Sequence, residues 1–92
     1  MKGQERLKRL IERIKLYIAV EDEVLSELRD LLYDFDGVKG DANYREKIES
    51  SMEWAAMFFS PQKSTPPDAR AFLLANLAVA ADMAADMDHR FA

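Results

Sequence analysis

Three side chains near the end of the sequence are of the types that bind divalent metal ions. Asp82, Asp86 and His89 are spaced i, i+4 and i+7, so on a helix they share one side. Carboxylate and imidazole groups at this spacing are capable of holding a metal. The same helix, however, turns this side away from the apolar face that contains Leu73. We therefore expect a solvated polar face here rather than a metal centre.

The sequence offers little else for catalysis or cofactor binding. His89 is the only histidine, and it has no serine partner at the spacing of a known catalytic motif. There are no cysteines, which excludes disulfides, thiolate metal sites and cysteine nucleophiles. The three glycines do not form a phosphate-binding loop. We predict that the protein is not an enzyme and carries no cofactor.

Arginines near the start of the sequence form a basic tip that could bind phosphate groups. Arg6, Arg9 and Arg13 lie along one side of a predicted helix. Residues 1–16 carry six basic and two acidic side chains, a net charge of +4, so the rest of the chain carries −8. The tip allows three interpretations: nucleic-acid binding, a membrane-surface helix, or ion pairs with nearby glutamates. The membrane interpretation is the weakest because Tyr17 is the only aromatic residue nearby.

The stretch from Gln4 to Phe35 is the element that must position these arginines. Its apolar residues recur every three or four positions, which is the spacing of a helix with one continuous buried stripe. A break at Asp22, which could cap a second helix, is the alternative. Because no glycine or proline interrupts the stretch, the sequence favours one long helix over residues 4–36.

Two shorter helices are predicted to follow. Gly37 is placed to end the first helix in a Schellman motif. A capping box that opens at Asn43 starts a helix over residues 43–59. A linker with three prolines comes next, and Thr65 is placed to cap a third helix over residues 66–89. The fold class is therefore all-α, a three-helix chain in which residues 1–92 form a single domain.

The long helix also predicts self-association. Its apolar stripe is longer than either of the two shorter helices can cover, so a homodimeric helical bundle is expected. Glu21 takes the place of one apolar layer, and a polar residue at such a layer fixes the register of a coiled coil. The predicted dimer seam consists of Leu7, Ile14, Glu21, Leu28 and Phe35.

A cluster of large apolar residues ends the predicted middle helix and is the strongest indication of a binding site. Trp54, Met57, Phe58 and Phe59 make this end apolar on all sides. One interpretation is core or dimer interface, with Phe58 and Trp54 inside. The other is a partner-binding patch in which Met57 faces solvent, because aromatic residues and methionine are enriched in interfaces.

Together these features predict a small interaction module that binds another protein, either as an accessory subunit or as an inhibitor that occludes a larger protein. Nucleic-acid association through the basic tip is the first alternative. An acidic mimic of nucleic acid, using the charge of −8, is the second. The start of the sequence does not read as a signal peptide, and the longest uncharged apolar run, residues 71–81, is too short to cross a bilayer. We therefore expect a cytoplasmic protein with no membrane segment.

Overall fold

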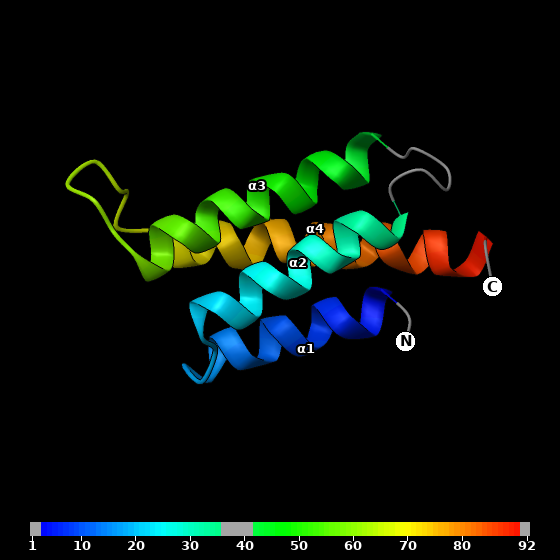
Figure 1. Cartoon of the computed structure of the whole chain (residues 1–92), viewed down its shortest axis with the longest axis horizontal. Coiled ribbons are helices and arrows are strands. Elements are labelled where there is room, and N and C mark those ends of the chain that lie inside the picture. The colour runs from blue at the N-terminus through cyan, green and yellow to red at the C-terminus, as the bar shows by residue number, and fades with distance from the viewer. Residues whose placement is uncertain (1–2, 36–41, 91–92) are drawn as a thin grey trace.

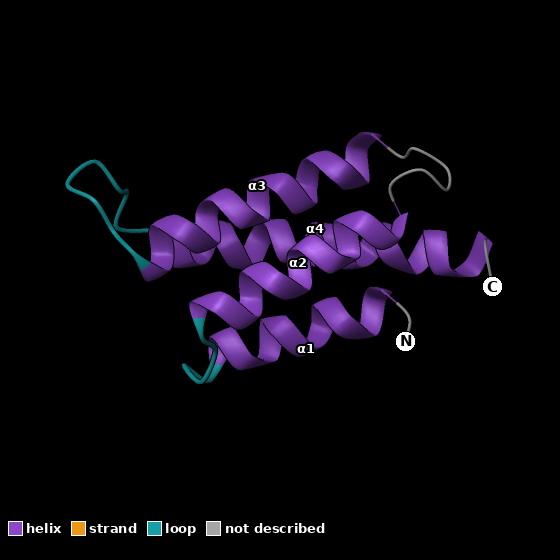
Figure 2. Cartoon of the chain, in the orientation of Figure 1, coloured by secondary structure: helices purple, strands orange, loops and turns teal. Residues whose placement is uncertain are grey.

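Four α-helices make up most of residues 3–35 and 42–90, the parts of the chain that the computed structural model describes. They are α1 (Gly3–Lys15), α2 (Glu21–Phe35), α3 (Ala42–Phe59) and α4 (Ala69–Arg90). The chain runs up and down, so that consecutive helices are antiparallel (Figures 1 and 2). The predicted all-α class is confirmed, and the prediction of three helices is wrong.

The helices form a bundle with one loosely closed side. α4 packs against both α1 and α3, and α3 also packs against α2, whereas α1 and α2 touch each other only slightly. The bundle measures 41 × 24 × 19 Å. The α1–α2 turn and the loop between α3 and α4 lie at one end, and α1 begins and α4 ends at the other (Figure 1). We call the end that contains the α1–α2 turn and the α3–α4 loop the loop end.

The core runs along the centre of the bundle and takes apolar residues from all four helices. The three-to-four spacing read from the sequence places them on the inner faces, as expected for amphipathic helices. The fully or almost fully buried members are Leu7, Leu10, Ile14, Val24, Leu28, Leu31, Tyr44, Ile48, Ala55, Leu73, Leu77, Ala80, Ala81, Ala84 and Met87. One copy of the chain therefore has a continuous core of its own.

The predicted long helix is interrupted between Lys15 and Glu21. The backbone N–H of Tyr17 donates to the Ile14 carbonyl oxygen at 3.2 Å, and that of Ile18 donates to the Arg13 carbonyl oxygen at 3.0 Å. This pair of hydrogen bonds is the Schellman motif that ends helices, and its left-handed position is usually occupied by glycine. Here Tyr17 adopts it, with φ of 58°. The break escaped prediction because the sequence lacks the glycine that normally marks it.

The start of α2 explains why the chain does not continue as one helix. Glu21, Asp22 and Glu23 fill its first turn, where carboxylates interact favourably with the positive end of the helix dipole. The N–H of Val24 donates to the carbonyl oxygen of Val20 at 3.0 Å, which makes Val20 the capping position. The three acids therefore start a new helix, close to where the alternative of a break at Asp22 placed it.

The other predicted boundaries agree more closely. The middle helix is found at Ala42–Phe59, and the Gly37 helix end lies outside the described residues. The last helix begins at Ala69, three residues later than predicted. The Thr65 hydroxyl accepts a hydrogen bond from the Gln62 N–H at 2.8 Å, so it closes a turn in the loop instead of capping α4.

The predicted dimer seam is largely used within one chain. Leu7, Ile14 and Leu28 are buried in the core of the single bundle. Glu21 is the first residue of α2 and accepts a hydrogen bond from the Ser60 hydroxyl at 3.1 Å, while the side chain of Phe35 lies outside those described. The break in the helix removes the over-long stripe on which the dimer was predicted, and the homodimer itself stays a prediction.

Candidate functional site

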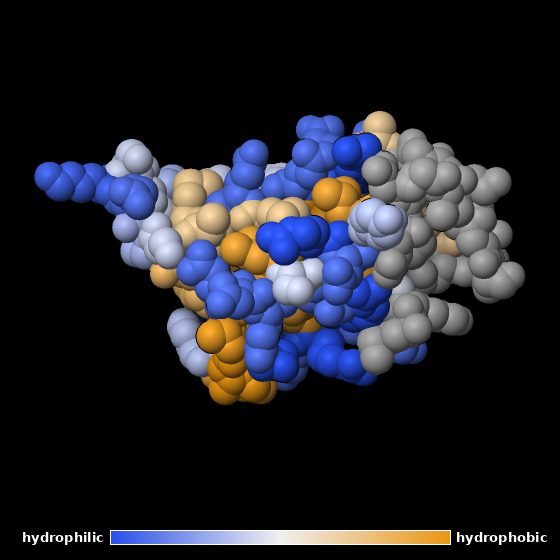
Figure 3. Space-filling model, in the orientation of Figure 1, coloured by the Kyte–Doolittle hydropathy of each residue, from blue (hydrophilic) through white to orange (hydrophobic). Residues whose placement is uncertain are grey.

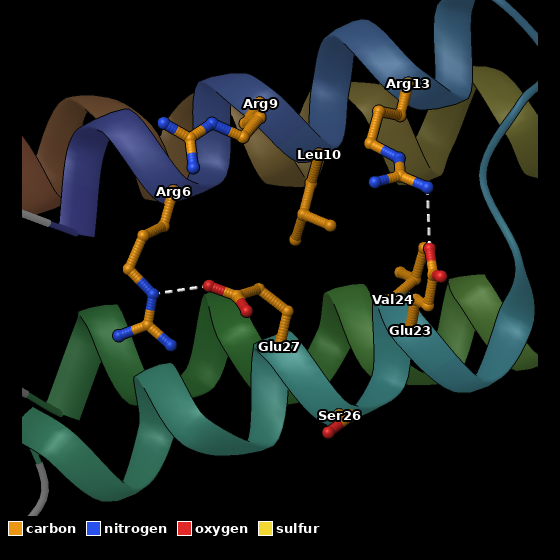
Figure 4. Close-up of a pocket in the computed structure, with 8 residues that line it drawn as sticks. All are labelled: Arg6, Arg9, Leu10, Arg13, Glu23, Val24, Ser26 and Glu27. Carbon is orange, nitrogen blue, oxygen red and sulfur yellow. Dashed lines mark hydrogen bonds and ion pairs between the residues drawn. The ribbon is translucent and has the colours of Figure 1, made fainter. Parts of the chain in front are cut away.

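The arginines of the basic tip line a groove between α1 and α2, the loosely closed side of the bundle. Arg6, Arg9 and Arg13 lie on the α1 wall of this groove, which has a volume of about 390 Å³ (Figure 4). Arg6 forms an ion pair with Glu27, and Arg13 forms one with Glu23 at 2.6 Å. Both glutamates come from α2, so the pairs cross the groove.

These ion pairs change what the basic tip can do. Phosphate groups would have to compete with carboxylates that already contact two of the arginines, and the lining of three arginines and two glutamates leaves little net charge. Beneath the pairs, Leu10 and Val24 are buried and close the floor. Of the three interpretations of the tip, the geometry is that of arginines paired with glutamates.

Four large apolar side chains that are exposed to solvent lie close together in the sequence, in the turn between α1 and α2. Leu16 and Ile18 are each 58% exposed, Val20 is 53% exposed and Tyr17 is 74% exposed. We call these four residues the apolar turn. The space-filling view shows strongly apolar side chains at this corner of the loop end, surrounded by polar surface (Figure 3). Contiguous exposed apolar surface is a feature that interaction sites share.

Arg70, the second residue of α4, fixes the apolar turn to the bundle. Its guanidinium lies over the Tyr17 ring, 4.4 Å from the ring centroid. The same guanidinium donates to the Lys15 carbonyl oxygen at 3.2 Å and, at the longer distance of 3.5 Å, to that of Ile14. A cation here satisfies the carbonyl groups at the end of α1 and interacts favourably with the negative end of its dipole. Arg70 therefore holds the turn both through the Tyr17 ring and through the backbone carbonyl groups that end α1.

Two hollows lie beside the apolar turn and share Tyr17 and Phe58. The smaller, of about 200 Å³, is lined by these two residues together with Ile14, Ala19 and Phe59. The larger, of about 370 Å³, lies against the proline loop, by which we mean residues 60–68. Its lining consists of Tyr17, Met57, Phe58, Pro61, Thr65, Pro66, Pro67, Ala69 and Arg70. The loop end thus combines projecting apolar side chains with mainly apolar hollows.

The predicted cluster at the end of the middle helix is divided between two places. Trp54 stacks on Phe72 of α4, with ring centroids 4.7 Å apart, and is partly buried. Phe58 and Phe59 contact each other edge to face at 4.9 Å and pack against the core. Met57 is partly buried in the lining of the larger hollow, so the prediction that it faces solvent fully is wrong. The proline loop covers what a helix considered alone would expose.

The residues considered for a metal site are not brought together with further ligands. Asp82 and Asp86 are exposed on α4, and the side chain of His89 lies outside those described. Among the described residues, no three histidine, aspartate or glutamate side chains are grouped as a metal site requires. The structure thus gives no geometry on which a metal centre could be argued.

Sequence reasoning missed the apolar turn, although the sequence contains a signal for it. Leu16, Tyr17 and Ile18 are consecutive, and on a helix three consecutive residues spread over about 200°. One buried stripe cannot accommodate such an arc, and Glu21, Asp22 and Glu23 follow at once. A run too wide for the stripe, directly before three acids, indicates the end of one helix and the start of another.

Comparisons with known proteins add no constraint on the function. No protein-family model, curated protein or solved structure matches the chain significantly. None of the helices in the described part of the chain is both long and apolar enough to span a membrane. The geometry of the loop end is therefore the basis of the functional argument.

Proposed function

We propose that this chain is a small, non-enzymatic interaction module that binds another protein through the apolar turn. The observation that carries the proposal is the exposure of more than half of each of its four large apolar side chains. Interfaces are built around such residues, and tyrosine is among the side chains that contribute most to binding. The sequence-based expectations of a non-enzymatic role and a cytoplasmic location are kept as part of this proposal.

The way the turn is held supports a binding role. Tyr17 adopts a left-handed backbone conformation that costs about 1–2 kcal/mol for a residue other than glycine. Arg70 and the Schellman hydrogen bonds hold the turn in this conformation. A surface that is already ordered loses less conformational entropy when it binds, which improves affinity. The strained backbone of Tyr17 would be explained if the partner binds the tyrosine side chain in the position that this conformation gives it.

The shape of the loop end suits an accessory subunit or an inhibitor. The apolar turn stands at one corner of an elongated bundle, where it can enter a concave surface of a larger protein (Figures 1 and 3). The adjoining hollows, with Met57 and Phe58 in their lining, offer adaptable apolar surface around the point of entry. A small bundle docked in this way would cover the surface it contacts.

The two alternatives have weaker support. Nucleic-acid binding through Arg6, Arg9 and Arg13 would require phosphates to displace glutamates from two of these arginines. An acidic mimic relies on the charge of −8 outside residues 1–16, which ordinary acidic proteins share. Neither alternative uses the exposed apolar turn.

The proposal is tested by comparing captured proteins between matched variants of the full chain. Leu16→Ser/Ile18→Ser removes apolar surface from the turn. The control variant, Tyr33→Ser, removes a side chain that is 83% exposed but lies on α2, outside the turn. All three proteins, including the unchanged chain, are immobilised and exposed to lysate, and the captured proteins are identified by mass spectrometry. We expect one protein to be retained by the unchanged chain and by Tyr33→Ser, and to be lost with the turn variant.

Calorimetry with that purified protein then measures the dissociation constant. Loss of two central apolar contacts should weaken binding by about tenfold or more, equivalent to about 1.4 kcal/mol. Equal affinity of the turn variant and the Tyr33 variant would overturn the proposal. Binding that is instead lost on replacing Arg6, Arg9 and Arg13 by glutamine, and that falls steeply with salt, would favour the nucleic-acid alternative.

A further inference from the structure

The loop end has the features of a surface that fits a copy of itself. Leu16, Ile18 and Val20 are exposed on the turn and line neither hollow, whereas Tyr17 of the same turn lines both. Projection and hollow are thus neighbours on one face. In a two-fold symmetric dimer each copy contributes the same face, so the projection of one enters the hollow of the other, twice.

Two side chains of opposite charge, Lys15 and Asp22, flank the apolar turn, so a second copy presents the complementary pair. Lys15 ends α1 just before the turn, and Asp22 lies in the first turn of α2 just after it. Both side chains are exposed, and within residues 3–35 and 42–90 neither forms an ion pair. A two-fold axis that lies at right angles both to the helices and to the line joining Lys15 and Asp22 places Lys15 of each copy opposite Asp22 of the other. Opposite charges then meet at two equivalent places.

The area that an interface requires points the same way. The largest apolar patch on a typical monomer covers about 300–600 Å², whereas a stable interface uses about 800 Å² from each partner. An occupant that also contacts the larger hollow covers more area than one that contacts only the four side chains of the turn. A second copy covers the turn and the larger hollow of each chain at once.

From these three observations we infer that the occupant of the loop end is a second copy of this chain, which makes an end-to-end homodimer through the apolar turns and the larger hollows. The inference rests on the proposed function, because it names the partner of the same site. It differs from the dimer predicted from the sequence, in which long helices lie side by side. The basic tips and the α1–α2 grooves are outside the contact.

The first experiment measures the mass and shape of the full chain. Sedimentation from micromolar to millimolar concentration should show a reversible dimer of twice 10.5 kDa. X-ray scattering of that dimer should give a largest dimension approaching twice the 41 Å length of one copy. Leu16→Ser/Ile18→Ser should weaken dimerisation about tenfold or more, whereas Tyr33→Ser should leave it unchanged. A compact dimer, or one that the turn variant does not weaken, overturns the inference.

The second experiment exchanges the flanking charges. Lys15→Glu brings two acids together at each of the equivalent places, and Asp22→Lys brings two bases together, so each variant alone should dimerise several-fold more weakly. An equimolar mixture should form a heterodimer, because the introduced acid of the first variant then meets the introduced base of the second. Circular dichroism confirms that each variant is folded. A mixture no tighter than the two separate variants overturns the inference.

The outcomes separate this inference from the proposed function. A chain that stays monomeric at millimolar concentration, yet captures a different protein through the turn, overturns the inference and supports the proposed function. A chain that is monomeric and captures no protein through the turn overturns both. A reversible end-to-end dimer that responds to the turn and charge variants supports the inference, and if the turn also captures no different protein it overturns the proposed role as an accessory subunit or inhibitor.

Discussion

Two apolar stretches of this chain differ from what their sequences suggest, and in opposite directions. Tyr17 and Ile18 were predicted to belong to a buried helical stripe, yet together with Leu16 and Val20 they form an apolar surface on which each side chain is more than half exposed. Residues 54–59 were predicted to be apolar on all sides, with Met57 facing solvent in one of two interpretations, and their large side chains are partly buried by contacts with α4, the core and the proline loop. The first stretch lies in the turn between α1 and α2, whereas the second lies within α3.

The difference shows where a helical periodicity can be trusted. Apolar spacing reports which side chains share a face only while the helix continues, and Tyr17 in a left-handed conformation ends it. At residues 54–59 the helix does continue, but Met57 and Phe58 line a hollow together with residues of the loop that follows. A surface assigned from one helix alone is therefore correct only when no later segment covers it. Four predictions test this contrast, beginning with the largest effect.

The first prediction compares a leucine of the predicted stripe, Leu28, with a leucine of the apolar turn, Leu16. Leu28 is fully buried, so Leu28→Asp leaves an unpaired charge in the core at a cost of several kcal/mol. Because small domains are stable by only about 5–15 kcal/mol, this variant should be largely unfolded. Leu16→Asp, on the exposed side of the helix break, should change the unfolding free energy by about 1 kcal/mol or less.

Circular dichroism and urea denaturation measure both variants. Similar destabilisation by the two substitutions would mean that Leu16 is buried and that the helix runs on through the turn.

The second prediction compares truncations in the two stretches. Phe58 packs against the core and is partly buried, so Phe58→Ala should cost about 2–4 kcal/mol, somewhat less than truncation of a fully buried phenylalanine. Ile18→Ala removes a mostly exposed side chain and should change stability by about 0.5 kcal/mol or less. Chemical denaturation provides the values, and a larger loss at Ile18 than at Phe58 would reverse the contrast.

The third prediction concerns the strained residue at the helix break. Alanine in place of Tyr17 keeps the cost of the left-handed conformation, whereas glycine removes it. Tyr17→Gly should therefore be more stable than Tyr17→Ala by about 1 kcal/mol, the reverse of their order within a helix. Both variants lose the contact with Arg70, so the comparison isolates the backbone. Thermal unfolding of the pair decides it, and the opposite order would place this residue in a helix.

The fourth and smallest effect is expected in the α1–α2 groove. Arg13 and Glu23 form an exposed ion pair, and such pairs contribute about 0–1 kcal/mol. Arg13→Gln should therefore lower the unfolding free energy only slightly, and the difference should shrink further in high salt because salt screens exposed charges. Denaturation at low and high salt tests this. A loss as large as that for Phe58→Ala would show that the groove, rather than the core, holds the hairpin together.

Much of the fold is predictable because it follows from local rules. The stripe correctly marks Leu7, Ile14 and Leu28 as inward-facing. The middle helix occurs where its apolar pattern places it, but it begins at Ala42, so Asn43 lies inside the helix and does not open it as predicted. The proline linker is also found, although α4 starts only at Ala69. Each of these features is encoded within one or two turns of chain.

The candidate site was harder to predict because it depends on contacts between distant segments. Arg70 is more than fifty positions from Tyr17 in the sequence, and only the fold brings its guanidinium onto that ring. The hollow that Met57 lines is formed together with Pro61, Thr65, Pro66 and Pro67 of the proline loop and with Tyr17 of the apolar turn. No local pattern reports such contacts, so the sequence indicated Met57 and Phe58 but not their relation to the turn.

The antiparallel path of the four helices has a practical consequence for attaching this protein to anything else. An even number of such helices returns the chain to the side where it began, so Gly3 and Arg90 lie at the end of the bundle opposite the apolar turn (Figure 1). A tether placed before the first helix or after the last would therefore point the turn away from its support. Either attachment suits display on beads or cells, and neither should obstruct the surface to be screened.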